Sequence, residues 1–136
     1  VTTKARVGMK FLIIEDETAA AKNLRSILST ITPDAQILDT LDTIVDSVEW
    51  FKNNPAPDLV FMDIRMPNMD GMDATRIIKE MSPQIPIIAL SSYSFEENVA
   101  EAKRAGMDDF ISKPFKVETL FECTKRYLGE SNKIKD

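Results

Sequence analysis

The sequence of 136 residues contains no histidine. This absence excludes Ser-His-Asp and Cys-His catalysis, and it removes the commonest ligand of transition-metal sites. The one cysteine, Cys123, cannot form an internal disulfide, and a free thiol suits a reducing compartment. No apolar run approaches the roughly 20 residues of a membrane span, and no signal-peptide pattern precedes the first apolar run. We therefore expect a cytoplasmic protein without membrane contact.

The chain also has fewer basic than acidic residues. The chain has 17 Lys and Arg against 22 Asp and Glu, a net charge of −5, which argues against a nucleic-acid surface because such surfaces need clustered cations. Its 43% hydrophobic residues are ordinary for a globular domain, and its length suits one domain with a real core. Because we find no linker or repeat, we expect a single domain over residues 1–136, with a core at about 9–128 and flexible ends at 1–8 and 130–136.

Short apolar runs recur along the chain at a regular interval. They are rich in β-branched and aromatic residues and do not alternate with polar ones, which is typical of strands buried on both faces of a parallel sheet. The runs are residues 11–14, 35–38, 59–62, 85–90 and 109–111.

Segments with helical periodicity separate or follow these runs. In the last of them, Val117, Leu120, Phe121, Thr124 and Leu128 form one predicted apolar stripe. Alternating strands and helices predict an α/β fold in which helices cover both faces of a parallel sheet. Two strand orders are common for such a fold, and the pattern alone does not choose between them.

Polar residues follow four of the predicted strands. This matters because ligands of open α/β sheets bind beyond the carboxyl ends of the strands. The first strand is followed by Glu15-Asp16-Glu17, the third by Asp63, the fourth by Ser91 and the fifth by Lys113. Carboxylates, a hydroxyl and an ammonium are thus expected at one edge.

Each of these residues also has a simpler interpretation. Glu17 directly precedes a predicted helix, where an acidic residue usually caps the first turn. Phe110 alone would be plain core packing. Asp63 is harder to explain in this way, because Pro67 and Gly71 separate it from the next helix. The coincidence of the groups at one edge therefore carries more weight than any single residue.

Crowding Glu15, Asp16 and Asp63 together is unfavourable unless a cation neutralises them. An all-oxygen site suits a hard divalent cation, Mg²⁺ or Mn²⁺. Beside the metal, one carboxylate can attack a phosphoryl donor and form an acyl phosphate. The metal, an ammonium and a hydroxyl would then share the charge of the phosphoryl oxygens.

The run DLVFMDIRMPNMDG at residues 58–71 resembles the phosphoacceptor segment of response-regulator receiver domains. Residues 13–17, 87–91 and 110–115 resemble the three other signatures of that family, and the likeness covers about 9–128. It implies a flavodoxin-like (βα)5 three-layer sandwich with a parallel sheet of order 2-1-3-4-5. In that order the first and third strands are neighbours.

The resemblance also implies a role for each acidic residue. Asp63 would be the phosphoacceptor. The metal would be bound by Asp16 and Asp63 directly, by Glu15 largely through water, and by the backbone carbonyl of Arg65. The last contact needs no particular side chain at position 65.

The resemblance further implies a switch. Lys113 would pair with the acceptor carboxylate and then with the phosphoryl group, and its bond to Pro114 would be cis. Ser91, where threonine is frequent, would move to a phosphoryl oxygen. The ring of Phe110, which lacks the hydroxyl of the frequent tyrosine, would turn inward and change the surface of residues 94–128.

The expected function is therefore a signalling switch, not an enzyme beyond its own phosphorylation and dephosphorylation. The phosphoryl donor would be a histidine kinase or a phosphotransfer protein, and the downstream protein target stays unknown. A monomer and a phosphorylation-dependent homodimer are both open. So are a stand-alone chemotaxis-like regulator and the receiver of a hybrid sensor kinase, which the start at Val1 instead of Met mildly favours.

Other functions fit less well. A phosphohydrolase with an aspartate nucleophile needs a second aspartate two residues later, where this chain has Arg65. A flavin or nucleotide binder needs a phosphate-cradling loop after the first strand, and Glu15-Asp16-Glu17 would repel a phosphate there. A docking module without phosphorylation would not need the four residues that this chain retains, namely Asp16, Asp63, Ser91 and Lys113.

Overall fold

The computed structural model describes residues 9–66, 69–91 and 96–128. The strands are β1 (Lys10–Ile14), β2 (Gln36–Leu41), β3 (Leu59–Asp63), β4 (Arg65–Met66), β5 (Met69–Asp70), β6 (Ile87–Ser91) and β7 (Asp109–Ser112). The helices are α1 (Thr18–Ile31), α2 (Ile44–Asn53), α3 (Gly71–Met81), α4 (Glu96–Ala105) and α5 (Val117–Leu128). The ends that we expect to be flexible, 1–8 and 130–136, lie outside the described residues.

Five strands form one parallel sheet in the order β2-β1-β3-β6-β7. Counted along the chain without the short β4 and β5, this is the order 2-1-3-4-5, so the expected flavodoxin-like fold is confirmed. The register sets Ile14 opposite Met62, and Asp63 opposite Leu90. The carboxyl ends of β1, β3 and β6 therefore meet at one edge of the sheet.

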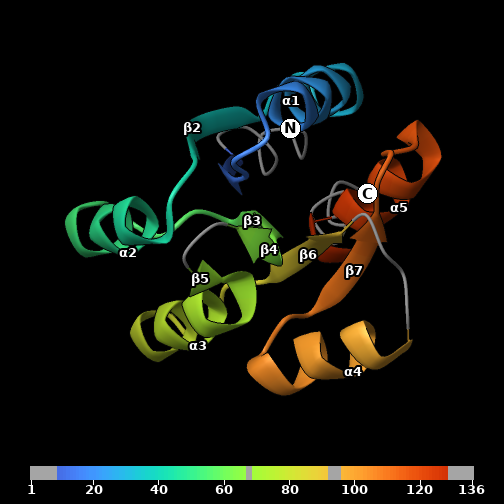
Figure 1. The fold of residues 1–136 in the computed structure, drawn as a ribbon. Coiled ribbons are helices and arrows are strands. Elements are labelled where there is room, and N and C mark those ends of the chain that lie inside the picture. The colour runs from blue at the N-terminus through green and yellow to red at the C-terminus, as the bar shows by residue number, and fades with distance from the viewer. Residues whose placement is uncertain (1–8, 67–68, 92–95, 129–136) are drawn as a thin grey trace.

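Helices cover both faces of the sheet, with α1 and α5 on one side and α2, α3 and α4 on the other (Figure 1). Alternation along β1 explains why its whole run is apolar. Phe11 and Ile13 pack in the core under α1 and α5, whereas Leu12 and Ile14 pack in the core under the other three helices. The rings of Phe11 and Phe61 meet edge to face, with centroids 6.0 Å apart. Strands buried on both faces need apolar residues at every position.

The predicted apolar stripe of α5 is only partly right. Leu120, Cys123 and Thr124 are buried, but Val117 is 48% exposed and Phe121 is 45% exposed. Successive residues of a helix are 100° apart, so the buried face is centred near Leu120 and Cys123, and Val117 and Phe121 lie on one flank. The prediction was therefore wrong for these two residues.

A short antiparallel hairpin between β3 and α3 was not predicted. β4 and β5 pair through Arg65 with Asp70 and through Met66 with Met69. Strands of two residues are too short to leave a periodic signal.

In the described part of the chain, no helix is long and apolar enough to cross a membrane.

Hydrogen bonds of Asp108 and Lys79, here called the clasp, hold the turn between α4 and β7. This turn is at the end of the sheet away from Asp63. Gly106 adopts a left-handed φ of 110° there. Asp108 Oδ2 accepts hydrogen bonds from the backbone N–H of Ile87 at 2.8 Å and from Nζ of Lys79 at 3.0 Å. Lys79 also donates to the carbonyl of Ile85 at 2.7 Å. The clasp ties α3 and β6 to the start of β7.

Candidate functional site

Three carboxylates meet at the carboxyl edge of the sheet. Glu15, Asp16 and Asp63 each offer an oxygen, and these oxygens all lie within 4.8 Å of one another. Because Ile14 and Met62 are paired in the parallel ladder, the residues that follow them are adjacent. Glu15 and Asp63 are buried, and Asp16 is half-buried.

The ammonium of Lys113 lies among these acids. Its Nζ is 2.7 Å from Oε1 of Glu15, 3.3 Å from Oδ2 of Asp63 and 3.7 Å from Oε1 of Glu17. The backbone N–H of Lys113 donates to the carbonyl of Ser91 at 2.7 Å, which holds the end of β7 beside the end of β6. The peptide bond between Lys113 and Pro114 is cis, as expected.

Burial and neighbouring charge shift the pKa values of this cluster. Burial is the main cause that raises the pKa of Glu15 to about 7, and the Asp63 carboxylate adds to it. Burial alone would lower the pKa of Lys113, but the carboxylates of Glu15 and Asp63 outweigh it and raise this pKa. The lysine therefore stays charged, while the acids repel one another.

The carboxylates of Glu15, Asp16 and Asp63 suit a divalent cation. Oε1 of Glu15 is buried and forms an ion pair with the Lys113 ammonium, 2.7 Å away. One ammonium cannot neutralise three carboxylates. An all-oxygen cluster with surplus negative charge is the donor set that hard divalent cations prefer.

Comparison with known proteins identifies the family. The response regulator receiver domain family matches residues 11–125. The chain belongs to this family. Over 122 residues it is 37% identical to the chemotaxis protein CheY of Halobacterium salinarum, covering 90% of this chain and 98% of CheY. It is thus a receiver domain of the kind that acts as a signalling switch.

Other similar proteins are larger. The regulatory protein LuxO of Vibrio cholerae is 30% identical over 124 residues, which are 91% of this chain but only 26% of LuxO. Among solved structures, the receiver domain of the sensor histidine kinase PA1611 from Pseudomonas aeruginosa has a TM-score of 0.79 and 26% identity, covering 90% of this chain and 99% of that one. That structure is described as having a magnesium ion coordinated in its active-site cleft.

The remaining predicted site residues have definite places in the receiver fold. Ser91 is buried at the end of β6, next to the residue paired with Asp63. Phe110 is half-buried on β7 and packs against the core under α2, α3 and α4. Arg65 lies in β4, two residues after Asp63. The roles that the resemblance assigns to these residues stay predictions.

Glu17 behaves differently from the expectation for a cap. It occupies the N-cap position of α1, but its side chain makes no cap hydrogen bond. Its carboxylate lies instead 3.7 Å from Lys113, and its backbone N–H donates to Oε2 of Glu15 at 3.1 Å. Sequence reasoning missed this contact, because the nearness of Glu17 to Lys113 depends on how the first and fifth strands end in space.

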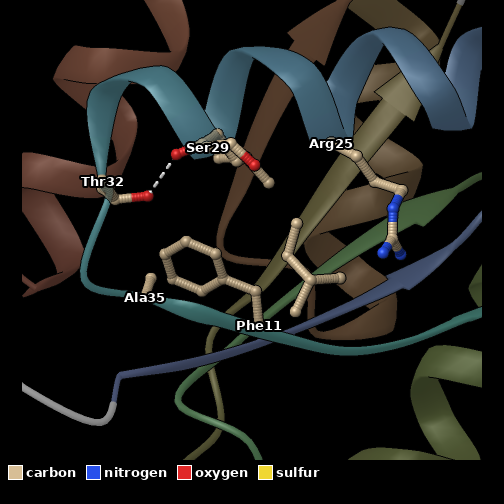
Figure 2. Close-up of a pocket in the computed structure, with 7 residues that line it drawn as sticks. Phe11, Arg25, Ser29, Thr32 and Ala35 are labelled. Atoms are coloured by element: carbon tan, nitrogen blue, oxygen red, sulfur yellow. Dashed lines mark hydrogen bonds between the residues drawn. The ribbon is translucent and has the colours of Figure 1, made fainter.

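Two cavities lie beside α1. One, of about 480 Å³, opens next to the acidic cluster, and Glu17, Asn23, Lys113 and Phe115 are among its lining residues. The other, of about 170 Å³, lies under the C-terminal half of α1, where the ring of Phe11 points into it (Figure 2). Because Phe11 is near the start of β1, this second cavity is remote from the acidic cluster.

Proposed function

We propose that this receiver domain accepts a phosphoryl group on Asp63 from a histidine kinase or a phosphotransfer protein. One observation carries the proposal. The carboxylate of Asp63 lies in a cluster of three acids whose oxygens are within 4.8 Å of one another, and it accepts a hydrogen bond from Nζ of Lys113 at 3.3 Å. A buried acid beside a cation site and an ammonium has the surroundings that acyl-phosphate chemistry needs.

Mg²⁺, or Mn²⁺ in its place, would be held by Glu15, Asp16, Asp63 and the carbonyl of Arg65, and would supply positive charge to the phosphoryl oxygens. An Asp63 oxygen attacks the phosphorus of the phosphohistidine. The P–N bond breaks with its electron pair on nitrogen, and the imidazole leaves after taking up a proton from water. Lys113 and the hydroxyl of Ser91 bind the oxygens of the transferred group.

The same residues would pass the signal on. As Ser91 turns toward the phosphoryl group, the ring of Phe110 moves inward and changes the surface of α4, β7 and α5 for a protein target. Hydrolysis of the acyl phosphate by the domain itself resets the switch. We place the domain in the cytoplasm, because its one cysteine is a free, buried thiol. A stand-alone regulator and a domain of a hybrid kinase are both compatible with this function.

Incubation with acetyl phosphate and Mg²⁺, followed by intact-mass measurement, tests the proposal. We expect the mass of one phosphoryl group to be gained by the wild type and by Asp58→Asn, and not by Asp63→Asn. Asp58 is a matched control because it lies just before β3, at the opposite end from Asp63, and accepts from the backbone N–H of Lys10. Equal labelling of Asp63→Asn would mean that another residue accepts the phosphoryl group, and would overturn the proposal. No labelling of the wild type, together with no binding of beryllofluoride or Mg²⁺, would leave only a docking module.

A further inference from the structure

The carboxylate of Glu17 does not cap helix α1. It is the N-cap residue of α1, where a side chain usually accepts from the first turn, yet it makes no such bond. The side chain is 64% exposed, and its Oε1 lies 3.7 Å from Nζ of Lys113. Both residues line the cavity of about 480 Å³ beside the acidic cluster.

Lys113 is therefore shared among three carboxylates. Two of them, Glu15 and Asp63, belong to the proposed metal and phosphoryl site, and the third, Glu17, lies on its solvent side. A cation that neutralises Glu15 and Asp63 would weaken their hold on the ammonium. Glu17 would then be the carboxylate that still competes with a phosphoryl oxygen for Lys113.

We propose that Glu17 is a positioning residue, which holds Lys113 back from the phosphoryl group and so weakens phosphoryl binding at Asp63. This inference rests on the proposed function. The physical basis is Coulombic, since an ammonium drawn toward Glu17 donates less to the phosphoryl oxygens. Because Glu17 is exposed, the effect is limited to that of a solvent-screened ion pair.

Beryllofluoride, which mimics a phosphoryl group on aspartate, is the probe for the test. Its affinity at saturating Mg²⁺ is measured by calorimetry for the wild type, Glu17→Gln and Glu118→Gln. We expect Glu17→Gln to bind about two- to fivefold more tightly than the wild type. Glu118→Gln removes the same charge from an exposed acid in the first turn of α5, and its affinity should match the wild type. Glu17→Asp keeps the charge on a shorter side chain and should lie between.

A second measurement separates an effect of Glu17 on the position of Lys113 from a general change in helix α1. The NMR resonance of the Lys113 ε-carbon, assigned with Lys113→Arg, is compared in the metal-free proteins. It should shift in Glu17→Gln and stay unchanged in Glu118→Gln. A change that only loosened α1 would weaken beryllofluoride binding and leave this resonance in place.

The outcomes distinguish this inference from the function on which it rests. No beryllofluoride binding by the wild type would overturn the proposed function. Binding by the wild type, with equal or weaker binding by Glu17→Gln, would overturn the role of Glu17 alone. Tighter binding by Glu17→Gln with an unmoved Lys113 resonance would mean that Glu17 repels the phosphoryl group directly, and would also overturn positioning.

Discussion

Oε1 of Glu15 lies 2.7 Å from Nζ of Lys113, whereas Oδ2 of Asp63 lies 3.3 Å from the same nitrogen. The ammonium that the proposed reaction needs is thus held more closely by Glu15 than by the acceptor. Any cation bound by Glu15 competes with Lys113 for this carboxylate. Metal binding and the availability of the lysine are therefore coupled through one side chain.

The raised pKa of Glu15 predicts a pH dependence of the stability of the metal-free protein. Its pKa is about 7 in the folded chain against an ordinary value of 4.5, mainly because of burial. Between these values the folded protein keeps a proton that the unfolded chain has released. Stability is therefore lost as the pH rises from about 4.5 to about 7, by roughly 3 kcal/mol from this residue.

Chemical unfolding in EDTA across this pH range measures the effect. Glu15→Gln cannot titrate, so its free energy of unfolding should fall less steeply than that of the wild type. Saturating Mg²⁺ should reduce the wild-type fall, because the cation favours the ionised carboxylate. Parallel pH profiles of the two proteins in EDTA would show that Glu15 does not titrate in this window.

Ser91 is predicted to separate metal binding from phosphoryl binding. Ser91→Ala removes the hydroxyl that we propose donates to a phosphoryl oxygen, and a bond to a charged group is worth about 1.5–3 kcal/mol. We expect beryllofluoride affinity to fall by at least about tenfold, with Mg²⁺ affinity unchanged. Ser112→Ala is the matched control, since Ser112 is the exposed residue paired with Ser91 across the sheet. Equal affinities of Ser91→Ala and the wild type for beryllofluoride would exclude this role.

Much of the fold could be predicted from the sequence because burial on both faces makes a strand continuously apolar. The apolar run at 59–62 matches β3 to within one residue, because β3 extends one residue further and ends at Asp63. Patterns within single strands do not specify which strands are neighbours, however. The order 2-1-3-4-5 came from the resemblance of four segments to one family, and the observed order confirms it.

The site was predictable where it depends on strand ends, and less so where it depends on side-chain directions. Glu15, Asp16 and Asp63 were expected together because parallel strands end at one edge. The contact of Glu17 with Lys113 was not expected, because a residue before a helix suggests a cap. Likewise Phe121 was assigned to the core because of its apolar side chain, although its direction around α5 leaves it largely exposed.

The neighbours Leu120 and Phe121 predict losses of stability of different size for the same substitution. Leu120 is fully buried on the inner face of α5, so Leu120→Ala should cost about 2–4 kcal/mol of stability. Phe121 is 45% exposed, with Nζ of Lys125 5.8 Å from its ring centroid, so Phe121→Ala should cost less than about 1 kcal/mol. Alanine suits a helix at both positions, and denaturant unfolding compares them directly. Similar losses would mean that Phe121 is covered in solution.

The clasp at Asp108 is predicted to stabilise the start of β7 more than an ordinary surface pair does. Asp108→Ala would leave the N–H of Ile87 and the ammonium of Lys79 without this acceptor. Water can reach the site, because the Asp108 side chain is 36% exposed, so the loss should be about 1–2 kcal/mol.

The exposed pair of Arg76 with Asp73 on α3 is the control, and Arg76→Gln should cost at most about 0.5 kcal/mol. Denaturant unfolding measures both losses. Hydrogen exchange at the amide of Ile87 adds a local readout, which should become faster in Asp108→Ala because its acceptor is gone. If the two variants lose equal stability and exchange at Ile87 is unchanged, the ladder between β3, β6 and β7 holds the turn without the clasp.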